Sequence, residues 1–142
     1  MGMANRVGIL AVVLLTTACN EPQGVIASEL TSSCALATGT YVSEATLRSK
    51  AGVCPRAKDH TRDRLVFDDD GAFISPAAVF IPCSTAQVAC NVNITCQVLD
   101  LQLKFTGELV DEGSRLVGVA TFTGSGDCKS IIYDVDAARP QP

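Results

Sequence analysis

The sequence lacks tryptophan, contains one histidine, and has no long hydrophobic run in its 142 residues. The longest apolar stretch, Val7–Leu15, is far shorter than the roughly 20 residues that a membrane-spanning helix needs. The formal charge is −4, and no basic cluster interrupts the chain. A mildly acidic chain has no field to attract nucleic acid or anionic lipid headgroups. These absences exclude a helical membrane span and argue against a nucleic-acid partner.

A catalytic motif is also missing. The one histidine, His60, lies in the charged segment Lys58–Asp63, where no nucleophile can be named for it to serve as a general base. Ser125 lies in a Gly-Ser-Gly sequence, but Thr123 stands where the G-x-S-x-G nucleophile turn requires its first glycine. We therefore interpret both segments as solvated loops or turns. The sequence predicts a protein that is not an enzyme and has no cofactor.

Metal binding is the next class that the sequence fails to support. Asp68–Gly71 could hold a hard cation, but it lacks the alternating spacing and the distal glutamate of an EF-hand. We interpret it as an acidic hairpin turn in which Gly71 adopts a positive φ. The closest cysteines, Cys90 and Cys96, are too far apart for the C-x-x-C spacing of zinc sites. We expect no metal ion.

The sequence does contain an export signal. Arg6 precedes the apolar stretch, and the small residues Thr16–Ala18 lead directly to Cys19. This segment resembles the lipobox of bacterial lipoproteins, in which the cysteine is lipidated on sulfur and becomes the new N-terminus. Thr16 departs from the leucine that the family usually carries there. The resemblance implies that residues 1–18 are a lipoprotein signal peptide, whereas the alternative is an ordinary secretory signal cleaved near Ala18.

The same resemblance implies where the protein resides. Cys19 would carry a diacylglyceryl group and an amide-linked acyl chain, which together suffice for stable anchoring. Asn20, instead of aspartate, follows the cysteine, which in this family permits transfer to the outer membrane. We expect a lipid-anchored protein of the bacterial cell envelope. Residues 19–33 contain Pro22 and Gly24 without sustained periodicity, so we predict a flexible tether there.

The chain has seven cysteines, an odd number. Lipidation of Cys19 leaves six for an oxidising compartment, where disulfides are their expected fate. Six cysteines allow 15 pairings, and we favour Cys54 with Cys128 in a barrel that pairs its first strand with its last. The six cysteines expected to form three disulfides are Cys34, Cys54, Cys83, Cys90, Cys96 and Cys128.

Residues 34–142 are predicted to form one disulfide-containing β domain. Period-two patterns separated by turn residues predict strands, while helical periodicity is weak throughout. We expect an antiparallel meander that closes into a small barrel or sandwich of about seven or eight strands. Cys54–Asp63 and Cys83–Cys96 are predicted to be loops. The predicted strands are Thr40–Ala45, Arg64–Phe67, 72–74, 78–81, Leu99–Phe105, Arg115–Phe122 and Cys128–Val135.

The clearest strand signal is Leu99–Phe105, in which apolar and polar residues alternate without error. The alternation predicts that Leu99, Leu101, Leu103 and Phe105 line the core, and that Asp100, Gln102 and Lys104 face water. An interior lined in this way could be either filled or hollow.

One further short motif bears on function. Gly39-Thr40-Tyr41 resembles the G-x-W start of the first strand in lipocalin-like barrels, with tyrosine in place of tryptophan. The resemblance implies a ligand-binding barrel.

We expect foremost a non-enzymatic, lipid-anchored envelope protein that acts through surface contacts. The first alternative is a lipocalin-like barrel that binds a small apolar ligand. An interior cavity of several hundred Å³ would favour it, and a filled interior would favour surface contacts. The second is an inhibitor of an envelope hydrolase, which an exposed loop at Ser84–Gln87 would support.

Overall fold

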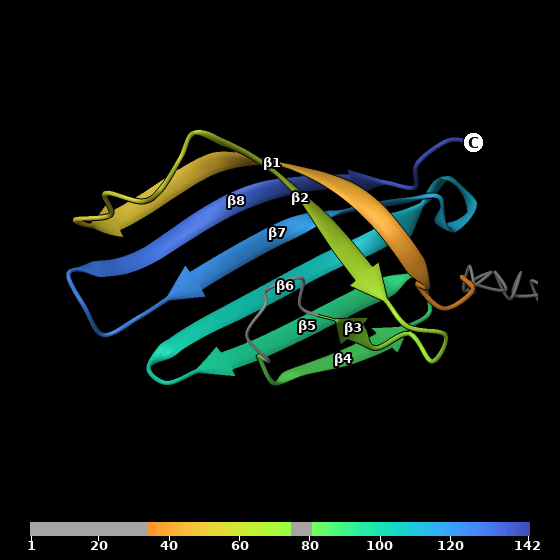
Figure 1. The fold of residues 1–142 in the computed structure, drawn as a ribbon, viewed down its shortest axis with the longest axis horizontal. Helices are drawn as coiled ribbons and strands as arrows, with labels where there is room; N and C mark the ends of the chain where they lie inside the picture. The colour runs from red at the N-terminus through yellow and green to blue at the C-terminus, as the bar shows by residue number, and fades with distance from the viewer. Residues whose placement is uncertain (1–33, 75–80) are drawn as a thin grey trace, which may run out of the picture. The chain divides into compact units, whose positions relative to one another are not determined.

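The computed structural model describes residues 34–74 and 81–142 (Figure 1). They form one antiparallel sheet of eight strands that curls into a nearly closed barrel. The predicted all-β fold is thus confirmed, while the predicted signal peptide, residues 1–18, and tether, residues 19–33, lie outside the described residues. The strands are β1 (Gly39–Gly52), β2 (His60–Phe67), β3 (Phe73–Ile74), β4 (Cys83–Val88), β5 (Asn91–Val98), β6 (Leu101–Val110), β7 (Arg115–Thr123) and β8 (Cys128–Ala138), with a 3-10 turn η1 (Asp111–Gly113).

The strand order in the sheet is β3-β2-β1-β8-β7-β6-β5-β4. Strands β4 to β8 form a meander, and β1 pairs with β8 to bring the first long strand beside the last. The edge strands β3 and β4 face each other across a seam, where the Phe73 amide donates to the Thr85 hydroxyl at 2.8 Å. Strand β3 pairs only with Val66 and Phe67 of β2. The first part of β2 therefore borders an open stretch of the seam in the described structure.

Two predicted loops contain strands instead. Cys83–Cys96 forms most of the β4–β5 hairpin, with Cys83 directly opposite Cys96. The half-buried face of β4 carries the polar Thr85 and Gln87 while Val88 is exposed, so the usual hydrophobic period is absent. Its turn uses Ala89 at φ 53° without a glycine, so the usual hairpin signal is absent as well. Strand β2 begins at His60, within the predicted Cys54–Asp63 loop. Of the strand predicted at 78–81, only Ile81 is described, and it lies outside any strand.

The predicted facing of Leu99–Phe105 is correct only in part. Phe105 is buried and Leu103 is partly buried against the core. The predicted core position of Leu99 is wrong, because Leu99 lies at φ 53° in the turn between β5 and β6 and is 91% exposed. Leu101 begins β6 at the rim of the barrel and is 47% exposed. Alternation reports which side of a strand a residue faces, but not where the strand ends.

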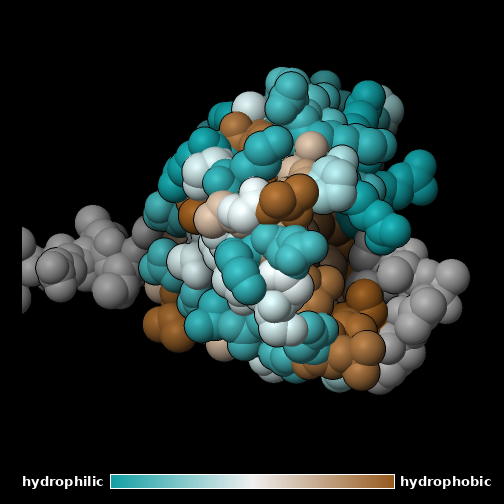
Figure 2. Space-filling model, turned by 90° about the vertical axis from the view of Figure 1, so that its left-hand side faces the viewer, coloured by the Kyte–Doolittle hydropathy of each residue, from teal (hydrophilic) through white to brown (hydrophobic). Residues whose placement is uncertain are grey.

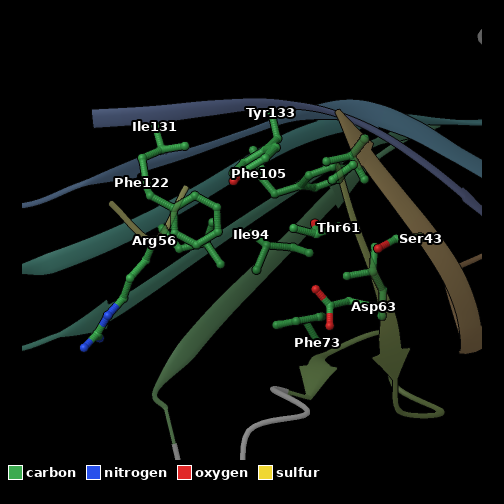
Figure 3. Close-up of a pocket in the computed structure, with 15 residues that line it drawn as sticks. Ser43, Arg56, Thr61, Asp63, Phe73, Ile94, Phe105, Phe122, Ile131 and Tyr133 are labelled. Atoms are coloured by element: carbon green, nitrogen blue, oxygen red, sulfur yellow. The ribbon is translucent and has the colours of Figure 1, made fainter. Parts of the chain in front are cut away.

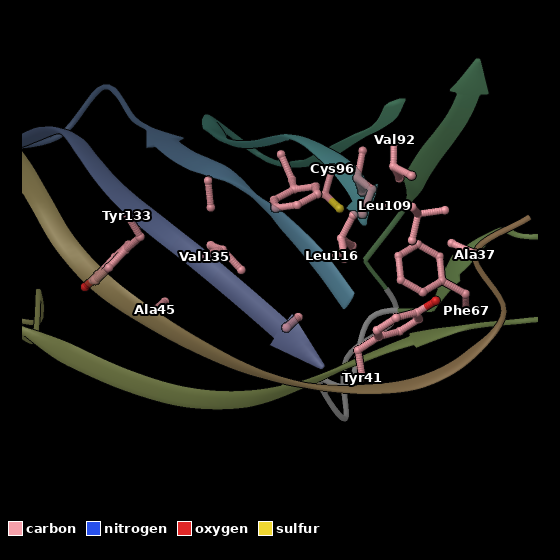
Figure 4. Packing of buried hydrophobic residues seen from close by; sticks show 14 of the residues in the cluster. Ala37, Tyr41, Ala45, Phe67, Val92, Cys96, Leu109, Leu116, Tyr133 and Val135 are labelled. Atoms are coloured by element: carbon pink, nitrogen blue, oxygen red, sulfur yellow. The ribbon is translucent and has the colours of Figure 1, made fainter. Parts of the chain in front are cut away.

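One half of the barrel interior is filled by side chains (Figure 4). We call this the packed half; its residues are Ala37, Tyr41, Phe67, Val92, Leu109, Leu116 and Ala137. The Tyr41 and Phe67 rings meet edge to face at 5.8 Å. Arg139 covers the Tyr41 ring at 5.2 Å from its centroid, and the Tyr41 hydroxyl donates to the Gly113 carbonyl at 2.9 Å. These contacts close this end of the barrel.

Three disulfides cross-link the described chain, as predicted: Cys34–Cys90, Cys54–Cys128 and Cys83–Cys96. The favoured pair, Cys54–Cys128, is present with its Cα atoms 4.7 Å apart. It forms because antiparallel pairing of β1 with β8 places the end of β1 beside the beginning of β8.

Candidate ligand-binding cavity

The other half of the barrel interior is not filled. It contains a cavity of about 320 Å³, which we call the interior cavity. Three inward positions carry small side chains here, namely Ser43 and Ala45 on β1 and Ala120 on β7. Because these side chains do not reach the barrel axis, the strands enclose space. The lining residues are Ser43, Ala45, Arg56, Thr61, Asp63, Leu65, Phe73, Ile94, Leu103, Phe105, Ala120, Phe122, Ile131, Tyr133 and Val135.

Phe105 forms the floor between the cavity and the packed half. Its ring lies over Gly107 and Gly118, which are directly opposite each other on β6 and β7. A Cβ added at either glycine would approach the Phe105 ring to 2.5 or 2.8 Å. The two glycines therefore allow the large ring to lie flat against the sheet, which keeps it out of the cavity.

The wall formed by β5 to β8 is apolar (Figure 3). Ile94, Phe122 and Ile131 project from it toward the space. Tyr133 packs edge to face on Phe122 at 6.1 Å, and its hydroxyl donates to the Lys58 carbonyl at 3.0 Å. That hydrogen bond ties the loop between β1 and β2 to the barrel beside the cavity.

The wall formed by β1 and β2 is more polar. Ser43 of β1 lies opposite Asp63 of β2, and Thr61 lies on the same face of β2. Arg56 reaches the cavity from the loop between the two strands. Within the described part of the chain, no oppositely charged group lies within ion-pair distance of either Asp63 or Arg56. The cavity thus combines an apolar surface with two charges that lack a protein partner there.

Two further hollows extend the cavity to the surface. The first, of about 480 Å³, lies at the seam and shares Asp63, Leu65, Phe73, Leu103 and Phe122 with the interior cavity. The second, of about 240 Å³, lies at the barrel end beside the Cys54–Cys128 disulfide and shares Arg56, Phe122 and Ile131 with it. Figure 2 views this end and shows apolar atoms recessed among polar ones. An apolar molecule could therefore enter the interior between the described strands.

The residues that the sequence offered for catalysis do not assemble a site. His60 is exposed, and its Nδ1 lies 3.4 Å from the Thr46 hydroxyl. The Ser125 hydroxyl hydrogen-bonds the Asp100 carboxylate and thereby joins two neighbouring turns. This hydrogen bond, followed by backbone hydrogen bonds, lowers the pKa of Asp100. Ser125 lies in a turn, as predicted, whereas His60 begins β2 and its assignment to a loop is wrong.

The acidic segment Asp68–Gly71 is a turn, as predicted. The Asp68 carboxylate accepts hydrogen bonds from the amides of Asp70 at 3.0 Å and Ala72 at 2.8 Å. Among the described residues, no group of three or more acidic, histidine or cysteine side chains could hold a metal ion. One oxygen of the Asp68 carboxylate therefore stabilises the turn.

The segment Ser84–Gln87 is not the exposed loop that an inhibitor would present. It lies within β4 and is paired along its length with β5. Gln87 accepts from the Ala37 amide at 2.9 Å and donates to the Ala35 carbonyl at 3.0 Å. It therefore fastens the segment that covers the packed half, and the prediction of a loop is wrong here.

The sequence did not reveal that Asp63, Arg56 and Phe122 line one cavity. The signal for Asp63 was present, because Thr61, Asp63, Leu65 and Phe67 occupy alternate positions. It was overlooked because the polar residues of β2 resemble the loop before them. Arg56 had no signal, since only the folded loop brings it to the barrel.

Comparisons of this chain with protein-family models, with curated proteins and with solved structures found no match. Across residues 34–74 and 81–142, no helix has the length and apolar character to cross a membrane. The function must therefore be inferred from the cavity itself.

Proposed function

We propose that this protein binds a small apolar ligand inside its barrel while anchored to the cell envelope through Cys19. The observation that carries the proposal is the interior cavity of about 320 Å³ with its wall of Ile94, Phe122 and Ile131. Ligand sites are typically concave, mostly apolar and several hundred Å³ in volume. Eight-stranded barrels are wide enough to hold one small ligand, as in lipocalins.

Packing energetics support a ligand as the reason for the cavity. Protein interiors are close-packed, and unfilled space costs stability in proportion to its volume. The packed half shows that this chain can fill its barrel with side chains. An apolar hollow retained in the other half is costly unless a ligand covers it.

The interior is the feature that separates this proposal from surface contact alone. A filled barrel would have favoured a protein that acts only through its surface, and only half of the barrel is filled. The Gly39-Thr40-Tyr41 motif supports the lipocalin-like alternative, because Tyr41 begins the inward face of β1 at the closed end. A lipid on Cys19 would hold the ligand site close to a membrane, which is itself a source of apolar molecules.

A single introduced tryptophan tests the proposal. Phe122→Trp places the only tryptophan of the chain in the cavity wall, in the full chain made soluble by Cys19→Ser. N-phenyl-1-naphthylamine, a neutral apolar dye, should accept energy from it and quench its emission with saturation at one dye per chain. A linear, unsaturable response would contradict a defined site.

Two matched variants locate the binding. Ala120 and Val117 both lie on β7, but Ala120 lines the cavity whereas Val117 is exposed on the outer face. Added to the reporter chain, Ala120→Phe should fill the cavity and abolish saturable quenching. Val117→Phe should leave quenching unchanged. Equal quenching in both variants would place the dye elsewhere.

The anchor is tested separately by intact-mass analysis of the wild-type protein extracted from membranes. The expected mature chain begins at Cys19 and carries acyl mass. A chain that begins elsewhere, or that lacks acyl mass, would contradict the lipid anchor without affecting the cavity.

A further inference from the structure

We infer that the cavity selects a cationic amphiphile, an apolar molecule with a protonated amine, and that Asp63 is its counter-charge. The inference rests on the proposed function and adds the chemical class of the ligand. It starts from the position of the one carboxylate in the cavity lining.

Asp63 is fixed on the inner face of a strand. It follows Thr61 and precedes Leu65 in the inward alternation of β2, and its backbone is paired with Ser43 of β1. Figure 3 shows its carboxylate between Phe73 and Thr61, directed into the cavity. Asp63 is itself exposed and also lines the hollow at the seam, so its carboxylate lies where the cavity opens to water.

Nothing in the described structure neutralises this carboxylate. The ion pairs there join Arg48 to Asp134 and Arg115 to Asp111 and Asp136. Arg62 and Arg64, the neighbours of Asp63 in sequence, alternate to the other face of β2. Arg64 also lines the hollow at the seam, but among the described residues neither arginine forms an ion pair with Asp63. The charge on Asp63 is therefore balanced by water while the cavity is empty.

Filling the cavity changes that balance. A ligand that displaces water from Asp63 incurs the cost of desolvating a carboxylate unless it supplies a hydrogen-bond donor or a positive charge. An ammonium group supplies both, and charge-assisted hydrogen bonds are roughly twice as strong as neutral ones. The rings of Phe73 and Phe122 line the same space and can add cation–π attraction.

Arg56 does not impose the opposite preference. It lies in the loop between β1 and β2, and its long aliphatic stem lets the guanidinium remain in water while the stem covers apolar surface. In Figure 3 its guanidinium points away from the centre of the cavity. An anionic ligand would gain little from Arg56 and would be repelled by Asp63.

Three probes with the same chain length separate these preferences: decylammonium, decanol and decanoate. They are titrated at pH 7 into the Phe122→Trp, Cys19→Ser chain against the naphthylamine dye. We expect decylammonium to bind about tenfold more tightly than decanol, equivalent to about 1.4 kcal/mol, and decanoate to bind most weakly. Asp63→Asn should remove the advantage of decylammonium.

The matched control is Arg56→Gln, which should preserve the order of the three probes. Asp63→Asn should still bind the neutral dye, which shows that its barrel is intact. Equal affinities for all three probes, or tightest binding of decanoate with its loss in Arg56→Gln, would overturn the inference while leaving the ligand-binding proposal in place. If neither the probes nor the dye bound the reporter chain with Asp63 and Arg56 in place, the inference and the ligand-binding proposal would both fail.

Discussion

The two halves of the barrel share the same eight strands and the same inward alternation, yet one is solid and the other is hollow. Tyr41, Val92 and Leu116 are completely buried in the packed half. In the other half three of the inward positions of β1 and β7 hold the small residues Ser43, Ala45 and Ala120, while Phe122 of β7 is large. The comparison shows that strand pairing and register form the barrel. The volume of the inward side chains decides whether the barrel interior has room for a ligand.

The halves also differ in what stabilises them. The packed half gains stability from buried apolar contacts together with the Cys34–Cys90 disulfide, which lies beside Leu109. Around the cavity those contacts are fewer, and the Cys54–Cys128 and Cys83–Cys96 disulfides lie at its end and along its seam. Covalent cross-links stabilise a fold by restricting the unfolded chain, so they can support a region whose interior must stay open.

The largest expected effect contrasts two leucines. Leu116→Ala removes a side chain that is 0% exposed, and it should lower the free energy of unfolding by about 2–5 kcal/mol. Leu101→Ala, at the open rim with 47% exposure, should cost about 1 kcal/mol or less. Urea denaturation of the oxidised Cys19→Ser chain measures both. Equal losses would mean that the two halves are packed alike.

The second expected effect concerns the cross-link at the hollow end. Replacing both Cys54 and Cys128 by serine should lower the free energy of unfolding by about 2–4 kcal/mol, because 74 residues separate them and the unfolded chain gains freedom. Denaturation under non-reducing conditions measures the loss. Dye binding should weaken as well, since this disulfide borders the barrel end. Unchanged stability would show that the hollow half does not depend on it.

The smallest expected effect is a dependence on acid at the packed end. Arg115 hydrogen-bonds Asp136 at 2.8 Å and lowers the pKa of that carboxyl. The folded state therefore binds fewer protons than the unfolded state, and this stabilisation is present above about pH 4 and is lost as pH falls through the lowered pKa. Because the pair is about half exposed, its contribution should be under about 1 kcal/mol.

Asp136→Asn should flatten the fall in stability below about pH 4, measured by denaturation across pH 2 to 6. Arg115→Gln should have a similar effect, since it removes the cause of the lowered pKa. An acid dependence that is unchanged in both variants would mean that the ion pair contributes nothing measurable.

Much of the fold was predictable from local patterns. The strands at Thr40–Ala45, Arg115–Phe122 and Cys128–Val135 were found because alternation and turn residues are properties of neighbouring positions. The Cys54–Cys128 pair followed once β1 was assumed to pair with β8. The β4–β5 hairpin was missed because β4 carries the polar Thr85 and Gln87 on its half-buried face and its turn has no glycine. Leu99 was misplaced because the alternation continues into the turn.

The sequence by itself determined the all-β fold class, the even number of six cysteines in the domain and which side of most strands faces inward. These features depend on residue type and spacing along the chain. Only the tertiary structure decided that the small inward residues Ser43, Ala45 and Ala120 line one cavity together with apolar residues of β5 and β6. It also decided that Arg56 and Asp63 reach that space. Such facts depend on contacts between residues far apart in the chain, and a cavity is a volume that no single strand encloses.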